Sequence, residues 1–301
     1  MVVTKTEIKE FASSIGLPIC GFAGVDRFAT SPEGAHPSDI LPGCKSVIVI
    51  GAPLLDGVIQ INFRAFEEGK KNMKGIYGTY GYSTLPNFEL TYACYAIARH
   101  IETNTNSNAT PCSTGPMTNG FQISIRHAAA AAGLGELGHM GIMLTPEHGP
   151  RIRFGVILTT LELEADPMYD GPKLCNAEKC GICVKVCPTG ALSPYAPETL
   201  KQVRIGGKQY EYPLINIPKC TKALLAMTKE LGGNEDYLKA ESPTFADIAE
   251  AQAKMPPYNH GLAGSSWHCG RCQSYCPVGN WGTKFKKTGL SSGPVFYEEK
   301  V

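Results

Sequence analysis

Cys175-Asn-Ala-Glu-Lys-Cys180-Gly-Ile-Cys183-Val-Lys-Val-Cys187-Pro188 is the stretch that decides how the C-terminal part of this chain folds. A second run, Cys269-Gly-Arg-Cys272-Gln-Ser-Tyr-Cys276-Pro277, repeats its Cys-x2-Cys-x3-Cys-Pro spacing, and Cys220 lies upstream. In such runs a short loop wraps three thiolates around one iron–sulfur cubane, while the cysteine before proline ligates the neighbouring cluster. The two runs therefore predict two 4Fe-4S clusters.

The crossed ligation rule assigns all eight cysteines of these segments. One cluster would take Cys175, Cys180, Cys183 and Cys276, and the other Cys187, Cys220, Cys269 and Cys272. The first gap is x4 where x2 is usual, and Cys220 stands well before Cys269, so an inserted segment interrupts the second loop. Two structural zinc sites are the alternative, although Cys-x2-Cys-x3-Cys-Pro runs fit tetrahedral zinc ribbons poorly.

Composition excludes several classes of protein. The 301 residues carry 28 basic and 27 acidic side chains, a net charge of +1, so no general attraction to polyanions is expected. With 43% hydrophobic residues the chain has material for a core. No apolar run reaches the roughly 18–20 residues of a membrane span. The first residues lack a secretory signal, and we expect a cytoplasmic protein.

The N-terminal part mixes helix and strand signals. Thr4-Lys-Thr-Glu7 predicts a capping box and a helix that ends at Gly16. Residues 46–50 and 151–163 predict strands, and residues 87–103 and 123–132 predict helices, with a polar loop at 104–122. We expect an α+β domain over residues 1–168, a two-cluster domain over 169–282 with an insertion at about 229–260, and a tail over 283–301.

Four further cysteines are isolated in sequence. Each is expected to be a small buried hydrophobe and not a nucleophile. They are Cys20, Cys44, Cys94 and Cys112.

Three segments carry a resemblance to a known family. They are Leu41-Pro-Gly-Cys-Lys-Ser-Val-Ile-Val-Ile50, Ala132-Gly-Leu-Gly-Glu-Leu-Gly-His-Met-Gly-Ile-Met-Leu-Thr-Pro-Glu-His-Gly-Pro-Arg-Ile-Arg153, and Cys-Pro-Thr-Gly-Ala-Leu192. Over roughly residues 15–282 the chain resembles the core shared by reductive dehalogenases and epoxyqueuosine reductases. The resemblance implies a nitroreductase-like α+β domain that binds cobalamin, followed by a C-terminal bacterial-ferredoxin-like domain with two clusters.

Corrinoid contacts follow from the resemblance. Glycine backbone lacks Cβ and approaches a flat macrocycle closely, so the resemblance assigns this role to Gly133, Gly135, Gly138 and Gly141. A helix end followed by a tight turn is the alternative explanation of these glycines. His127 and His148 are further candidate contacts, for which a purely structural role is the alternative.

The resemblance also places candidate catalytic residues. Members of this family carry a tyrosine or an acid above the corrinoid and a basic residue in the Gly-Leu-Gly segment; here Asn119 and His139 stand at corresponding places. Gly75-Ile-Tyr-Gly-Thr-Tyr-Gly-Tyr82 offers Tyr77, Tyr80 and Tyr82 as proton donors. Aromatic packing is the alternative for these tyrosines. For His139 the alternative is a helix cap or a partner to a backbone carbonyl. Arg151 and Arg153 face either solvent or a corrinoid side chain.

Three functions fit these patterns. The first is a cobalamin-dependent iron–sulfur reductase that delivers low-potential electrons to a small organic substrate. The second is an iron–sulfur electron-transfer protein that reduces the corrinoid or metal centre of a partner, and the third is a corrinoid carrier. A ferredoxin or flavodoxin is the expected electron donor, and no nucleic-acid partner is expected because the net charge is near zero.

Overall fold

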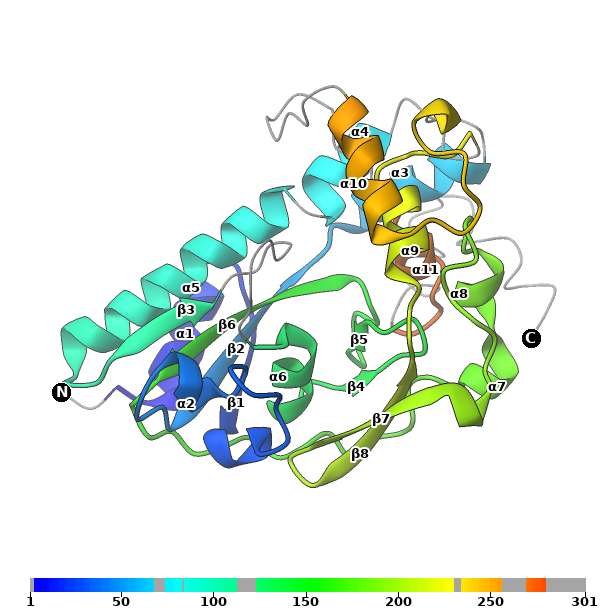
Figure 1. The fold of residues 1–301 in the computed structure, drawn as a ribbon. Helices are drawn as coiled ribbons and strands as arrows, with labels where there is room; N and C mark the ends of the chain where they lie inside the picture. The colour runs from blue at the N-terminus through cyan, green and yellow to red at the C-terminus, as the bar shows by residue number, and fades with distance from the viewer. Residues whose placement is uncertain are drawn as a thin grey trace.

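A four-stranded antiparallel sheet forms the centre of the N-terminal part in this computed structural model, which describes residues 3–67, 74–82, 84–112, 123–229, 234–255 and 269–279. Its strand order is β1-β2-β6-β3 (Figure 1). The strands are β1 (Ile19–Gly24), β2 (Ser46–Pro53), β3 (Ala109–Cys112) and β6 (Ile152–Thr159). The strands predicted at 46–50 and 151–163 are thus confirmed as the two central ones.

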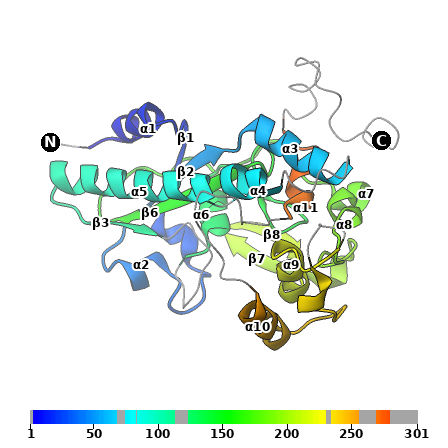
Figure 2. The ribbon, with the colours of Figure 1, turned by 90° about the horizontal axis from the view of Figure 1, so that it is seen from above.

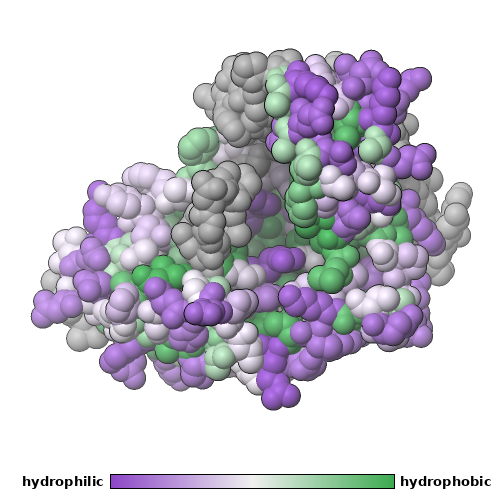
Figure 3. All heavy atoms as spheres, in the orientation of Figure 1, coloured by the Kyte–Doolittle hydropathy of each residue, from purple (hydrophilic) through white to green (hydrophobic). Residues whose placement is uncertain are grey.

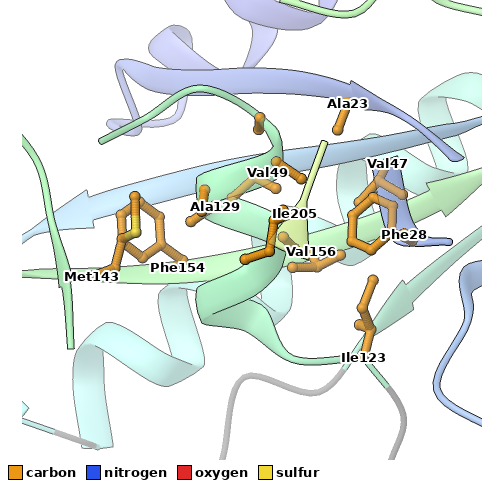
Figure 4. Packing of buried hydrophobic residues seen from close by; sticks show 14 of the residues in the cluster. Ala23, Phe28, Val47, Val49, Ile123, Ala129, Met143, Phe154, Val156 and Ile205 are labelled. Carbon is orange, nitrogen blue, oxygen red and sulfur yellow. The ribbon is translucent and has the colours of Figure 1, made fainter. Parts of the chain in front are cut away.

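Alternation along β2 places its side chains on two separate cores. Val47 and Val49 face one core together with α6 (Ile125–Ala131), and Figure 4 shows them beside Val156 and Ala129. Ile48 and Ile50 face the other core, beneath α1 (Lys5–Ser14) and α5 (Thr84–Asn104). Because successive strand residues point to opposite faces, one β-branched run builds both layers.

The predicted helices of this part are confirmed. Thr4 caps α1 and forms the capping box with Glu7, and the chain leaves the helix through Gly16, whose φ of 88° suits glycine. Ser124 caps α6, and α5 covers the predicted range 87–103. Shorter elements are α2 (Pro37–Ile40), α3 (Asp56–Glu67), α4 (Lys74–Tyr77), the π-helical turn Gly78–Tyr82, β4 (Glu136–Leu137) and β5 (Met143–Leu144).

The cysteine-rich part consists of short helices around a hairpin. Its elements are α7 (Ala177–Cys180), α8 (Ile182–Lys185), β7 (Leu200–Ile205), β8 (Lys208–Pro213), α9 (Ile217–Leu224), α10 (Phe245–Lys254) and α11 (Arg271–Ser274). The helices gather at one end of the molecule, where α11 contacts α3, while the hairpin β7–β8 extends toward α6 (Figures 1 and 2). Helix α10 lies in the predicted insertion.

The hairpin β7–β8 ties the two parts together, which the sequence did not predict. Ile205, Tyr210 and Tyr212 join the core on the α6 side of the central sheet, and Figure 4 shows Ile205 beside Val156. This hairpin lies between Cys187 and Cys220 in the sequence, so part of the cysteine-rich region completes the N-terminal core. Among the described residues no helix combines the length and hydrophobicity that crossing a membrane would take.

Candidate functional site

The first group of cysteines comes from two distant segments. Cys175 precedes α7, Cys180 ends it, Cys183 lies on α8, and Cys276 follows α11. Cys183 and Cys276 are buried and contribute to one apolar cluster, against which Cys175 packs. Burial, together with the neighbouring Cys175, Cys276 and Cys180, raises the pKa of Cys183 to about 12.

The second group gathers from three segments. Cys187 follows α8, Cys220 lies on α9, and Cys269 and Cys272 flank the start of α11. Burial raises the pKa of Cys272 well above its ordinary value, as do, in decreasing order, Cys269, Cys220, Cys183 and Cys187. Apart from Cys183, these neighbours belong to the crossed set that the sequence predicted.

The chemistry of these two sets suits iron–sulfur clusters. Several buried thiols without a cation stay protonated, because burial disfavours the thiolate. A bound metal supplies positive charge and deprotonates its thiol ligands, and sets of soft sulfur ligands are typical of iron–sulfur clusters and zinc. Within the described ranges, no three His, Cys, Asp or Glu side chains are placed around a single metal ion. In a cubane each thiolate binds a different iron atom. A cluster therefore does not require three of the cysteines to surround one metal ion.

Backbone amides support one thiol in each set. The His139 amide donates to the Cys175 Sγ at 3.3 Å, and the Ala191 amide donates to the Cys187 Sγ at 3.2 Å. Hydrogen bonds to cluster sulfurs are one of the means by which a protein sets a reduction potential. His139 therefore touches the candidate cluster site through its backbone.

The imidazole of His139 has a structural partner. The side chain is 5% exposed, its Nε2 lies 2.9 Å from the Ser193 carbonyl oxygen, and its ring lies 6.1 Å from that of Tyr195. This arrangement is that of a histidine paired with a backbone carbonyl, and not of a proton donor open to substrate.

Of the three candidate tyrosines, Tyr77 is fully buried. Its hydroxyl donates to the Gln273 Oε1 at 3.1 Å, which links the end of α4 to α11. Burial raises the pKa of Tyr77 well above its ordinary value. A hydroxyl held in this way supports aromatic packing, the alternative role considered for this loop.

Tyr80 and Tyr82 differ in their surroundings. Tyr80 is 46% exposed and is the candidate whose ring reaches solvent. Burial raises the pKa of Tyr82 to about 12, against the opposing effect of Arg153, whose guanidinium lies 5.2 Å from the ring centroid. Arg153 also donates to the Asn87 Oδ1. The catalytic candidate Asn119 lies outside the described residues.

The four candidate corrinoid glycines have close neighbours within the chain itself. A Cβ on Gly133 would lie 2.0 Å from the Pro167 carbonyl oxygen, and one on Gly135 would lie 1.9 Å from that of Leu144. At Gly138 and Gly141 it would meet the side chains of Leu144 and Ile215. Gly133, Gly135 and Gly141 also have positive φ. The helix end and tight turn considered as the alternative account for these glycines, and corrinoid contact stays a prediction without support from these positions.

The two candidate histidines are also held by protein groups. The His127 Nε2 lies 3.5 Å from the Tyr212 hydroxyl, and burial, aided by Arg126 and Lys201, lowers the pKa of His127 to about 4. The His148 Nε2 lies 3.7 Å from a Glu147 carboxylate oxygen. Their role as corrinoid contacts stays a prediction.

Three residues of this site were missed by sequence reasoning. The Glu136 carboxylate accepts backbone hydrogen bonds beside Cys175, Arg151 is 4% exposed and donates to the Cys276 carbonyl, and Gln273 connects Tyr77 to the Pro150 carbonyl. Arg151 therefore faces protein backbone, which neither of the two orientations predicted for it included. Tertiary contacts alone reveal these roles, because each partner is 38 or more positions away in sequence.

A cavity of about 200 Å³ opens beside Cys175. Its walls come from β4, from the segment before α7 and from β8, and they include Glu136, His139, Tyr210 and Glu211. Figure 3 shows a separate hollow on the face toward the viewer, between the lobe that carries α10 and the body of the molecule.

The remaining cysteines lie away from both sets. Cys44, Cys94 and Cys112 are buried in the two cores of the central sheet, and Cys20 packs against one of them. Burial raises the pKa of Cys20 to about 12 and that of Cys112 to about 12. Their surroundings are those of small buried hydrophobes, as predicted.

Comparisons with known proteins agree with this geometry. Residues 178–193 match the family model for a 4Fe-4S binding domain. An epoxyqueuosine reductase from Gloeobacter violaceus is 27% identical over 172 residues, which cover 57% of this chain and 49% of that protein. This chain thus matches about half the length of that relative.

Solved structures share the fold. An epoxyqueuosine reductase crystallised with an epoxyqueuosine-modified tRNA stem loop has a TM-score of 0.51 at 18% identity, covering 91% of this chain and 64% of that one. A catabolic reductive dehalogenase has a TM-score of 0.52 at 19% identity, covering 82% and 33%. Together the matches show that this chain shares the mixed α/β fold of these structures and carries a 4Fe-4S binding motif.

Proposed function

We propose that this chain is an iron–sulfur reductase in which two 4Fe-4S clusters carry low-potential electrons toward a substrate. The observation that carries the proposal is the convergence of eight cysteines from segments up to 101 positions apart into the two crossed sets. The matched 4Fe-4S model over residues 178–193 and the named relatives support it.

The clusters would relay single electrons between a donor and an acceptor. In each cluster the protein's part is to supply four thiolates, exclude water and donate hydrogen bonds to sulfur. The donor would be a low-potential ferredoxin or flavodoxin. Of the three candidate tyrosines, Tyr80 is the most exposed and is the best placed to meet a substrate and donate a proton.

A nitroreductase-like domain that binds cobalamin is the finer proposal, and it rests on the family resemblance. The cavity beside Cys175 does not itself fit this group. The cavity beside Cys175 holds about 200 Å³, below the roughly 300–1,000 Å³ of sites for drug-sized ligands, and a corrinoid is larger still. The hollow in Figure 3 is where contact with a corrinoid would be sought.

This observation favours a second candidate function. An iron–sulfur relay that reduces the corrinoid or metal centre of a partner needs both clusters but no corrinoid site of its own. The structural partners of Tyr77 and His139 agree with it, since a relay requires no proton donor.

The substrate class remains part of the proposal. We favour a small organic molecule with a carbon–heteroatom bond that low-potential electrons can cleave. The relative crystallised with a tRNA stem loop conflicts in part with the expectation of no nucleic-acid partner. Modified tRNA therefore joins the small molecules as a substrate to be tested.

Elemental analysis tests the clusters. Protein purified without oxygen and reconstituted with iron and sulfide should hold about eight iron and eight sulfide per chain, as two cubanes require. Cys183→Ser and Cys272→Ser should each remove part of the iron, while Cys94→Ala serves as a matched control that keeps it all. One or two zinc ions without iron would overturn the proposal.

Cobalamin titration distinguishes the two functions. Stoichiometric binding, with a cobalt(II) EPR signal that disappears on reduction, is expected of the cobalamin-dependent enzyme. Failure to bind cobalamin while both clusters remain reducible would leave the relay and refute the enzyme with its own corrinoid. Turnover should then appear only when a partner protein is added.

A further inference from the structure

A carboxylate holds the segment that carries Cys175. Glu136, the first residue of β4, accepts hydrogen bonds at its Oε1 from the backbone amides of Leu174 at 2.6 Å and Cys175 at 2.7 Å. Two positions further along from β4, the His139 amide donates to the Cys175 Sγ. One short stretch of the N-terminal part therefore fixes both the backbone and the sulfur of this cysteine.

A guanidinium holds the opposite side of the same cysteine set. The Arg151 Nη1 donates to the Cys276 carbonyl at 2.8 Å, and its Nη2 donates to the Val278 carbonyl at 2.6 Å. Arg151 precedes β6 and is 4% exposed, so its charge lies inside the protein next to Cys276. The planar fork of arginine suits two carbonyls that lie close together.

The two side chains bring opposite charges to one cysteine set. The Glu136 carboxylate is bonded to the backbone of Cys175 itself. The Arg151 guanidinium is bonded to the backbone of Cys276 itself. Each charge thus lies next to one cysteine of this set.

We propose that Glu136 and Arg151 are positioning residues that set, in opposite directions, the reduction potential of the cluster bound by Cys175, Cys180, Cys183 and Cys276. This inference rests on the proposed function, since it requires the cluster. Reduction adds one electron to the cluster and breaks no bond to its ligands. The carboxylate opposes that added negative charge and lowers the potential, whereas the guanidinium favours it and raises the potential.

The substitution Glu136→Gln tests the carboxylate, because the amide oxygen still accepts the two backbone hydrogen bonds while the charge is lost. A unit charge within about 10 Å of a redox centre changes its equilibrium by about tenfold at an effective dielectric constant of ~20. We therefore expect one cluster to become easier to reduce by about tenfold, or about 59 mV for one electron.

Matched variants separate charge from fold. Glu211 lines the same cavity but is exposed, so solvent screens its charge and Glu211→Gln should leave both potentials near their wild-type values. Arg151→Gln should move the same cluster in the opposite direction by a comparable factor, and Arg151→Lys, which keeps the charge, should move it less. If the Arg151 variants fail to fold, the Glu136 and Glu211 pair decides the test by itself.

The measurement is a dithionite titration of the holoprotein followed by EPR. Cys175→Ser identifies which of the two reduced-cluster signals belongs to this set. Wild-type protein without clusters would refute the proposed function. Two intact clusters with potentials that are equal in wild type, Glu136→Gln and Glu211→Gln would refute this inference and leave the proposed function standing. An equal shift in both Gln variants would also refute it, because the effect would then be a general one of surface charge.

Discussion

Tyr77→Phe removes one oxygen atom from the contact between the N-terminal part and α11. The ring of Tyr77 stays in an apolar cluster with Leu54, Ile59 and Tyr275, while its hydrogen bond to the Gln273 Oε1 is lost. The buried amide oxygen is then left without this donor. Loss of one partner of a buried hydrogen bond costs about 1–3 kcal/mol.

Thermal unfolding of the anaerobic holoprotein measures this cost. One kcal/mol corresponds to about 2–4 °C in proteins of 150–250 residues and to somewhat less in longer chains, so we expect the midpoint to fall by about 2–8 °C. Tyr77 lies beside the loop of Cys269 and Cys272, since a Cβ on Gly270 would meet the Tyr77 hydroxyl. The absorbance of the cluster assigned to these cysteines should therefore also be lost faster on heating.

Tyr80→Phe is the matched control. It makes the same chemical change three positions along, on a side chain that is 46% exposed, and should leave the unfolding midpoint within about 1 °C, since surface substitutions usually stay within ~0.5 kcal/mol. Equal midpoints for Tyr77→Phe and wild type would show that the buried hydrogen bond contributes nothing. A loss of turnover with Tyr77→Phe at unchanged stability would return Tyr77 to a catalytic role.

Three further predictions concern the buried cysteines, a histidine and the iron. Cys94→Ala should keep all the iron and cost about 1 kcal/mol of stability, because Cys94 fills space in the core as a small hydrophobe; lost iron would contradict this. His127→Gln should flatten the pH dependence of stability between about pH 6.5 and 4. The pKa of His127 is about 4 in the folded chain and about 6.5 in the unfolded chain. The wild type is therefore stabilised above pH 6.5 and loses that stability at lower pH, as protons bind the unfolded chain. Parallel curves for both proteins would refute this. Removing iron by oxidation and chelation should lower the unfolding midpoint, measured by circular dichroism, because two buried sets of thiols lose their counter-charge; an unchanged midpoint would show that the clusters do not stabilise the fold.

Local sequence signals predicted the parts of the fold that depend on local physics. The capping box of Thr4 and Glu7 and the β-branched run of β2 each act within a few residues, and each is found where it was expected. The glycines from Gly133 to Gly141 were harder, because a residue without Cβ suits a macrocycle and a backbone crossing equally well. Only the positions of Pro167 and Leu144 show which neighbour lies there.

The hairpin β7–β8 and the contacts of Glu136 and Arg151 with the cysteine segments could not be predicted for a different reason. Arg151 immediately precedes β6, where successive side chains point to opposite faces of the sheet. This alternation does not predict a contact with the segment containing Cys276, 125 positions later. Pairing of Glu136 with the Cys175 segment likewise depends on how β4 meets the cysteine-rich part. Long-range pairing is set by the packing of the whole core and not by propensity within one window.

These long-range contacts give the N-terminal part a role beside the two proposed clusters. A small ferredoxin must position its cysteines with its own short loops, whereas here β4 holds Cys175 through Glu136, the start of β6 holds the Cys276 segment through Arg151, and Tyr77 holds α11 through Gln273. Each of these contacts comes from the N-terminal part, and each ends on a segment that carries candidate ligands. The N-terminal part therefore orients the thiolates and places fixed charges beside them, which are the means by which a protein adjusts an iron–sulfur centre without changing its ligands. A change in the core of the central sheet should consequently reach the clusters through these three side chains before it affects the cysteine loops themselves.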